Sequence, residues 1–123
     1  MYLLDTNIII YYLKGDPLVV NYLNNLLIKN YLFYISVISE TELFSFEKLT
    51  KEEEDEIKKV LETLYILPID SQIARLAGFL KRSFKIGLAD SLIGATALIY
   101  KLNLITRNVR DFKKIPGLSI TSI

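Results

Sequence analysis

The chain begins MYLLDTNIII (residues 1–10), a short apolar run that is interrupted by one acidic residue, Asp5, and then resumes. This pattern predicts a short strand over residues 2–4, followed by a helix over residues 7–14 that Gly15 ends. An ionised carboxylate beside apolar residues is costly unless it caps a helix, pairs with a cation or binds a metal ion. Asp5 therefore has two interpretations, a helix N-cap or a metal ligand, and the rest of the sequence has to decide between them.

Strand-like and helix-like segments alternate along the rest of the chain. Further strands are expected at residues 32–37, 65–69, 103–106 and 118–123, and further helices at 18–28, 39–48, 70–84, 88–102 and just after residue 108. Ser39 and Glu42 predict a capping box at the start of helix 39–48, and Thr50 predicts the cap of one more helix, which carries the acidic run EEEDE (52–56) on a solvated face. This order predicts the α/β class, with a parallel sheet covered by helices on both faces.

The composition excludes several kinds of chemistry. The 123 residues contain no Cys and no His, so this chain cannot form a thiol nucleophile, a zinc–thiolate site, an imidazole base or a Ser-His-Asp triad. Any bound metal would have oxygen ligands, which favours Mg²⁺ or Mn²⁺. No segment approaches the roughly 20 apolar residues of a membrane span, and the N-terminus lacks the features of a secretion signal, so we expect a cytoplasmic protein.

Charge and hydrophobicity both point to partners. Residues 1–69 carry 6 Lys and Arg against 11 Asp and Glu, whereas residues 70–123 carry 9 against 3. A basic C-terminal part fits a polyanionic partner, although scattered surface lysines would give the same count. The hydrophobic content of 51% is slightly above the average of globular domains. We therefore expect some apolar surface to be covered by another chain.

Four acidic residues stand where the expected strands end or a helix begins. Asp5, Glu42 and Asp111 each follow a strand, and Asp90 opens the helix 88–102 above small residues at positions 94 and 97. Each acid also has a local interpretation as a cap or as a first-turn acid. Because parallel sheets bind ligands beyond the carboxyl ends of their strands, we expect the four carboxylates to meet there. A divalent cation would relieve their mutual repulsion.

These segments together resemble the PIN-domain ribonucleases. The matching stretches are LLDTNIII (3–10), SVISETEL (36–43), IGLADSLIGATAL (86–98) and LITRNVRDFKKIPGLSI (104–120). The subgroup that the chain resembles is the VapC-type toxins of prokaryotic toxin–antitoxin pairs. The resemblance covers essentially the whole chain. It implies one three-layer α/β/α PIN-like domain over residues 1–123 with a mostly parallel central sheet, an RNA substrate, a VapB-type antitoxin as partner and a homodimer.

The same resemblance assigns roles to individual residues. Asp5 and Asp90 are the expected ligands of Mg²⁺, and Glu42 and Asp111 complete the catalytic cluster. Glu40 is the alternative to Glu42, and Asn108 the alternative to Asp111, since some relatives carry an acid directly after the Thr-Arg pair. The residues expected to orient the carboxylates or to touch phosphate are Thr6, Asn7, Thr106 and Asn108. The residues expected to contact RNA phosphates are Arg107 and Arg110, with Lys113 and Lys114 beside them.

The expected activity is metal-dependent hydrolysis of RNA by a bound water, which leaves a 5′-phosphate and a 3′-hydroxyl. The alternative is a PIN-like RNA-binding or protein-interaction module without catalysis, in which the acids serve only as caps. A phosphotransferase that uses Asp5 as a covalent nucleophile would need a second acid nearby, but position 7 is Asn.

Overall fold

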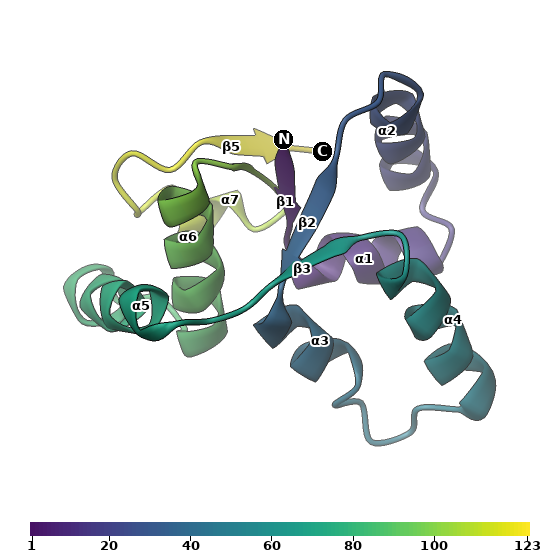
Figure 1. Ribbon diagram of the computed structural model, residues 1–123, viewed down its shortest axis with the longest axis horizontal. Coiled ribbons are helices and arrows are strands. Elements are labelled where there is room, and N and C mark those ends of the chain that lie inside the picture. The colour runs from purple at the N-terminus through teal and green to yellow at the C-terminus, as the bar shows by residue number, and fades with distance from the viewer.

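The computed structural model describes residues 1–123 and contains one five-stranded sheet with helices on both faces (Figure 1). The strands are β1 (Tyr2–Leu4), β2 (Phe33–Ser36), β3 (Tyr65–Leu67), β4 (Asn103–Thr106) and β5 (Ile120–Ser122). They lie in the order β3-β2-β1-β4-β5, and every neighbouring pair is parallel. The predicted α/β/α architecture with a parallel central sheet is confirmed.

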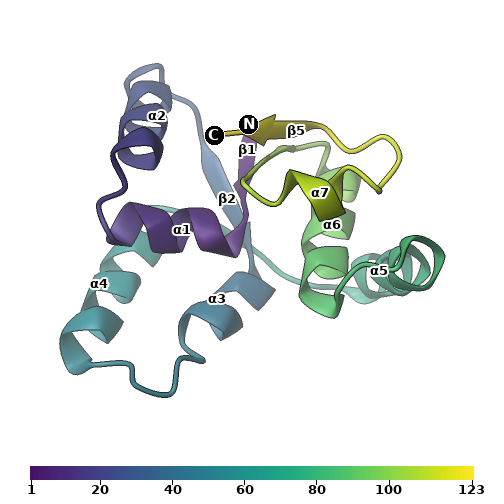
Figure 2. The same cartoon turned by 180° about the vertical axis from the view of Figure 1, so that it is seen from behind.

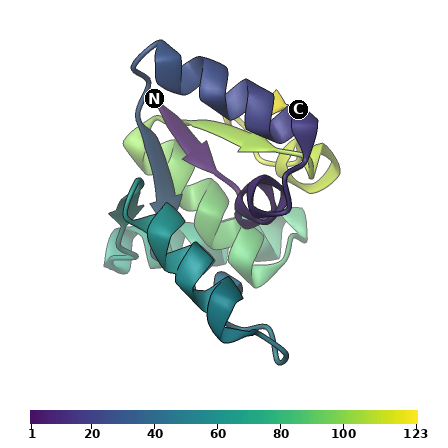
Figure 3. The ribbon, with the colours of Figure 1, turned by 90° about the vertical axis from the view of Figure 1, so that its right-hand side faces the viewer.

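Seven helices form the outer layers. They are α1 (Thr6–Leu13), α2 (Pro17–Ile28), α3 (Val37–Leu43), α4 (Lys51–Leu61), α5 (Ser71–Phe84), α6 (Leu88–Tyr100) and α7 (Val109–Phe112). Helices α1 to α4 lie on one side of the strands and α5 to α7 on the other, in the front and back views alike (Figures 1 and 2). The side view has α2 and α4 in front of the sheet (Figure 3). None of the helices is long and apolar enough to cross a membrane.

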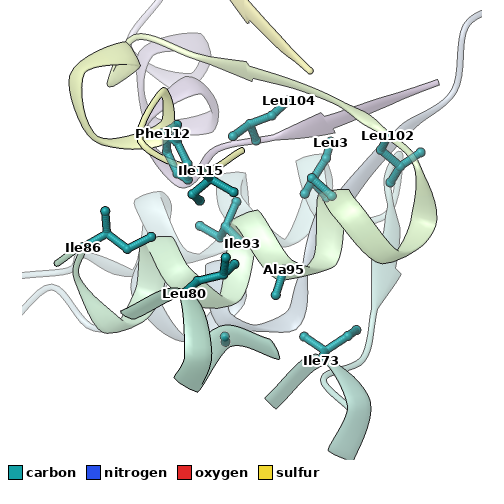
Figure 4. Close-up of a cluster of buried hydrophobic side chains, with 12 residues drawn as sticks. Leu3, Ile73, Leu80, Ile86, Ile93, Ala95, Leu102, Leu104, Phe112 and Ile115 are labelled. Atoms are coloured by element: carbon teal, nitrogen blue, oxygen red, sulfur yellow. The ribbon is translucent and has the colours of Figure 1, made fainter. Parts of the chain in front are cut away.

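Each face of the sheet has its own apolar core. Successive strand residues point to opposite faces, so Leu3 and Leu104 pack towards α5 and α6, whereas Leu4 and Ile105 pack towards α1 and α2. Figure 4 shows the first of these cores, with Phe112 of α7 near the end of β4. The three inner strands β1, β2 and β4 are largely buried on both faces, which explains why they read as apolar runs in the sequence.

The small residues beneath Asp90 have a packing role. A Cβ atom on Gly94 would lie 2.5 Å from Cδ1 of Ile115, which is itself buried. The absence of a side chain at position 94 therefore allows the segment after α7 to pack directly on α6, and this contact holds α7 beside the first turns of α6.

The helix predicted over residues 39–48 begins and ends earlier than expected. Helix α3 spans Val37–Leu43, and its N-cap is Ser36, whose Oγ accepts a hydrogen bond from the Ile38 amide at 3.2 Å. Ser39 is buried inside the helix and forms no capping box with Glu42. Two serines lie three residues apart, and the one at the end of the strand caps the helix.

The other predicted caps are present. Thr50 and Glu53 form a reciprocal capping box at the start of α4, with both hydrogen bonds at 3.1 Å. Asp70 caps α5 by accepting from the amide of Ile73 at 2.9 Å. These caps fix where α4 and α5 begin.

Candidate active site

Asp5 lies at the carboxyl end of β1, in the middle of the sheet, and its side chain is only 4% exposed. It occupies the N-cap position of α1, but its carboxylate forms no capping hydrogen bond. Instead, the Thr106 hydroxyl at the end of β4 donates to Oδ2 of Asp5 at 2.8 Å. Burial raises the pKa of Asp5, and the hydrogen bond from Thr106 opposes that rise. The N-cap interpretation therefore does not explain this acid.

Asn108 connects two further acids to the same place. Its side-chain amide nitrogen, Nδ2, donates to Oδ2 of Asp90 at 3.1 Å and to Oδ2 of Asp111 at 3.2 Å. Its backbone amide donates to the Thr106 hydroxyl at 2.9 Å. A continuous set of hydrogen bonds thus runs from Asp5 through Thr106 and Asn108 to the other two carboxylates.

Glu42 reaches the site from α3. The Thr6 hydroxyl lies 2.6 Å from Oε1 of Glu42 and 2.8 Å from Oγ of Ser39. A hydroxyl has one proton, so Thr6 donates to the carboxylate and accepts from the buried Ser39. The negative charge of Glu42 also raises the pKa of Asp90, whereas that of Glu40 has no such effect. Of the two glutamates, Glu42 is the one near the other acids.

The electrostatics of Asp90 connect it to the other three acids. Its pKa is raised to about 6, first by burial and then by the negative charges of Asp5, Asp111 and Glu42. The hydrogen bond from Asn108 opposes this rise. Like charges raise a carboxyl pKa in this way where water screens them poorly.

Positive charge compensates only one of these acids. Lys114 lies 3.5 Å from Asp111, and the pKa of Asp111 is below its usual value because of the hydrogen bond from Asn108 and this nearby lysine. Asp5, Glu42 and Asp90 form no ion pair. The site therefore carries uncompensated negative charge on oxygen ligands.

This set of donors fits a divalent cation such as Mg²⁺. No group of three or more acidic side chains has the arrangement of a ready-made ion cage. Mg²⁺ commonly keeps several waters and binds through only one or two carboxylates. The assignment of Asp5 and Asp90 as direct ligands, with Glu42 and Asp111 acting directly or through water, stays a prediction.

Two of the predicted residues lie outside this cluster. Asn7 is exposed and forms no side-chain hydrogen bond. The guanidinium group of Arg107 makes two hydrogen bonds to Asp16, at 2.9 and 3.0 Å, and lies 4.4 Å from the centre of the Tyr11 ring. No sequence pattern indicated this contact, because Asp16 precedes Pro17 and has the pattern of an N-cap of α2. Arg110 is exposed next to Asp111.

Comparisons with known proteins agree with this geometry. The sequence matches the PIN domain family over residues 2–118. It is 34% identical to Ribonuclease VapC2 of Rickettsia felis, over 96% of this chain and 94% of that protein. It is 32% identical to Ribonuclease VapC19 of Mycobacterium tuberculosis H37Rv, over 96% of this chain and 97% of that protein.

Solved structures share the whole fold. A chain in the crystal structure of VapBC2 from Rickettsia felis, bound to a DNA fragment from its promoter, superposes with a TM-score of 0.86 and 30% identity, covering 99% of this chain and 98% of that one. A chain in DNA-bound VapBC from Salmonella typhimurium has a TM-score of 0.85 and 27% identity, covering 98% and 96%. The similarity includes every element that carries one of the four acids.

Proposed function

The chain belongs to the PIN domain family, and on that basis we propose that it is a Mg²⁺-dependent endoribonuclease, the toxin of a VapBC-type toxin–antitoxin pair. Its curated relatives are named ribonucleases, and its structural neighbours are toxin–antitoxin complexes. The observation that carries the proposal is the gathering of Asp5, Glu42, Asp90 and Asp111 at one edge of the sheet, where burial and then the charges of the other three acids raise the pKa of Asp90 to about 6.

Asp5 and Asp90 would hold the metal ion, with Glu42 and Asp111 acting through water. A bound Mg²⁺ lowers the pKa of a coordinated water and neutralises charge on the phosphate. Thr106 keeps the Asp5 carboxylate in place through its 2.8 Å hydrogen bond. Asn108, with no negative charge, fills the gap between Asp90 and Asp111 and orients both.

The exposed basic residues next to Asp111 would bind the RNA backbone. Arg110 and Lys113 are exposed and form no ion pair, so their charges are available to phosphates. Such contacts place a phosphodiester beside the acids without selecting a base sequence. Hydrolysis by water would leave a 5′-phosphate and a 3′-hydroxyl.

The non-catalytic alternative explains the acids less well. If Asp5 were only a cap, its carboxylate would accept a hydrogen bond from the second or third amide of α1, and it forms no such capping bond. Folding also buries Asp5 and raises its pKa, which costs stability unless a cation compensates the charge. A cap role alone leaves this cost without a compensating interaction.

The test is RNA cleavage by the purified chain and by Asp5→Asn. Asn has nearly the same shape as Asp but removes the charge, so cleavage in Mg²⁺ should fall to background, while thermal stability in EDTA should hold or rise. The matched control is Asp70→Asn, because Asp70 is a true cap and Asn caps equally well, so cleavage should be unchanged. Undiminished cleavage by Asp5→Asn, or cleavage that persists in EDTA, would refute the mechanism.

We also propose where an antitoxin would bind. A groove of about 590 Å³ runs between α1, the loop after α3, and α4. Its apolar lining is Ile10, Leu13, Leu43, Phe46, Leu49 and Ile57. Three carboxylates and two lysines surround it, Glu47, Glu53, Glu56, Lys14 and Lys48. This chemistry suits an apolar segment with basic residues, contributed by the antitoxin.

The antitoxin proposal can be tested by co-expression with the product of the small neighbouring gene that such pairs require. Phe46 is 52% exposed, so Phe46→Glu should weaken the complex without lowering the stability of the free chain. A complex that survives this substitution unchanged would place the antitoxin elsewhere.

A homodimer remains part of the proposal. Strand β3 is at the edge of the sheet, and two of its residues, Tyr65 and Ile66, are 55% and 38% exposed. Apolar side chains on an open strand edge favour association with another chain. A second copy of this chain is the partner that we infer for this edge.

A further inference from the structure

Three side chains outside the acidic cluster form a compact unit at the carboxyl end of the sheet. Arg107 follows β4 directly, Asp16 lies in the turn between α1 and α2, and Tyr11 lies in α1. Both terminal nitrogens of the guanidinium group pair with both oxygens of the Asp16 carboxylate, at 2.9 and 3.0 Å. The side chains of the pair are each 25% exposed, and the guanidinium covers the Tyr11 ring at 4.4 Å.

This unit is less exposed and has a more specific geometry than the other ion pairs of the chain. Two of these are exposed lysine pairs one turn apart on α4, and the third joins Lys114 to Asp111 three residues before it. A two-point contact between Arg and a carboxylate fixes orientation as well as distance, which a lysine contact does not. Asp16 is also held from its other side, because it accepts from the amides of Leu18 and Val19 as the cap of α2.

Arg107 is the middle residue of the tripeptide that organises the acids. On one side, Thr106 donates to Asp5, and on the other, Asn108 donates to Asp90 and Asp111. The amide of Asn108 donates to the Thr106 hydroxyl at 2.9 Å, so the three residues form a tight turn. The side chain of Arg107 leaves this turn in the direction of α1 and α2.

We propose that Asp16 and Arg107 are positioning residues that hold the turn 106–108 so that Thr106 and Asn108 keep the metal-binding carboxylates in place. The inference rests on the proposed function and deepens it. Asp16 anchors Arg107 to the rigid start of α2, and Arg107 in turn fixes the backbone between the two hydrogen-bond donors. Loss of the anchor would let the turn move and would loosen Asp5 and Asp90 together.

Asp16 has a second effect on the site. An arginine next to four carboxylates would pair with one of them if it were free, and that pair would compete with a metal ion. Asp16 neutralises the charge of Arg107 and holds the guanidinium group against α1, away from the four acids. This contact holds the pKa of the Asp16 carboxyl below its usual value.

The decisive variants are Asp16→Asn and Arg107→Lys. Asn at position 16 still caps α2 but lacks the charge and the second acceptor, and Lys at position 107 keeps the charge but lacks the two-point contact. Residues that orient metal ligands typically contribute 10- to 100-fold to affinity or activity. We expect each variant to lower kcat for RNA cleavage about tenfold and to weaken Mn²⁺ binding, measured by calorimetry, by a similar factor, with KM within about twofold.

A matched control is Glu54→Gln, which breaks an ion pair of 3.2 Å on α4 far from this turn and should change neither quantity. A merely structural role would lower the fraction of folded protein, so it would reduce the Mn²⁺ stoichiometry and leave the affinity of the folded fraction unchanged. That result would overturn the proposal. If Arg107 instead binds RNA phosphate, Asp16→Asn frees it and lowers KM, which would also overturn the proposal.

Amide hydrogen exchange in metal-free protein keeps this inference separate from the proposed function. The Asn108 amide donates to the Thr106 hydroxyl, a bond that should slow its exchange. This amide should exchange faster in Asp16→Asn than in the wild type, while exchange of the sheet amides stays unchanged. If the wild-type chain proves inactive on RNA but this local change occurs, the proposed function fails and the anchoring role stands. Unchanged exchange at Asn108 would refute the anchoring role whatever the activity.

Discussion

Replacing Asp90 with Asn should stabilise the metal-free protein at neutral pH, although Asp90 is a candidate ligand. The carboxylate is surrounded by Asp5, Asp111 and Glu42, and its pKa rises from 3.8 to about 6. Asn removes the charge but keeps an oxygen that accepts the hydrogen bond from Asn108. The repulsion therefore disappears while the contact remains.

The magnitude follows from the shift in pKa. A rise from 3.8 to about 6 corresponds to about 3 kcal/mol between the two protonation states, at about 1.4 kcal/mol per unit of pKa. Asp90 is only partly buried, so solvent screening reduces this figure. The favourable interaction of a charged Asp90 with the N-terminus of α6, about 0.5 kcal/mol, is lost as well. We expect a net gain of about 1 kcal/mol in the free energy of unfolding.

The effect of Asp90 on the free energy of unfolding depends on pH. The folded chain binds the Asp90 proton more tightly than the unfolded chain, so the contribution of Asp90 to stability is fully present below about pH 4 and is lost as the pH rises through about 6. Urea unfolding in EDTA at about pH 7.5 should show Asp90→Asn as the more stable protein, and the difference should shrink to a small fraction near pH 4. A variant that is less stable at neutral pH, or a difference that is the same at both pH values, would refute the electrostatic account of the site.

Three further predictions concern packing, RNA binding and assembly. Gly94→Ala should destabilise the chain by about 1–2 kcal/mol, because the new Cβ would meet Cδ1 of Ile115. Ile115→Val lacks that atom, so thermal unfolding of the double variant should show part of the lost stability restored. Strictly additive effects of the two substitutions would contradict this contact. Arg110→Gln should raise KM for RNA and reduce the slope of its salt dependence by about one, and an unchanged slope would exclude a phosphate contact. Light scattering at micromolar concentration should give the mass of a dimer, and a monomer mass would refute the proposal that a second copy binds at β3.

The element order could be predicted because every local signal acts within a few residues. Strands are short apolar runs, Thr50 and Asp70 mark helix starts through their own caps, and Gly15 adopts the positive φ of 76° that ends the first helical segment. The predicted start of α3 was wrong because both Ser36 and Ser39 are residues that commonly cap helices. Only burial in the folded chain distinguishes them.

Contacts between distant parts of the chain could not be predicted in the same way. The strand register placed three acids at one edge, but it did not indicate that Thr6 would bond to Glu42, 36 residues away, or that Arg107 would pair with Asp16, 91 residues away. Each of these contacts depends on the order of the strands, which the sequence pattern leaves open. The catalytic and metal-binding roles of the acids remain predictions.

The place of β1 at the centre of the sheet has a consequence for the order in which the candidate site forms. The strand is the first to be synthesised, yet one of its two neighbours, β4, is the fourth of five, and the Thr106 hydroxyl that holds Asp5 comes 101 residues later. Such distant parallel pairing forms late, after most of the chain is available. During translation Asp5 and Glu42 are synthesised well before Asp90 and Asp111. A growing chain therefore lacks a complete set of four acids for most of its time on the ribosome. The site can first assemble only after residue 111 has been synthesised.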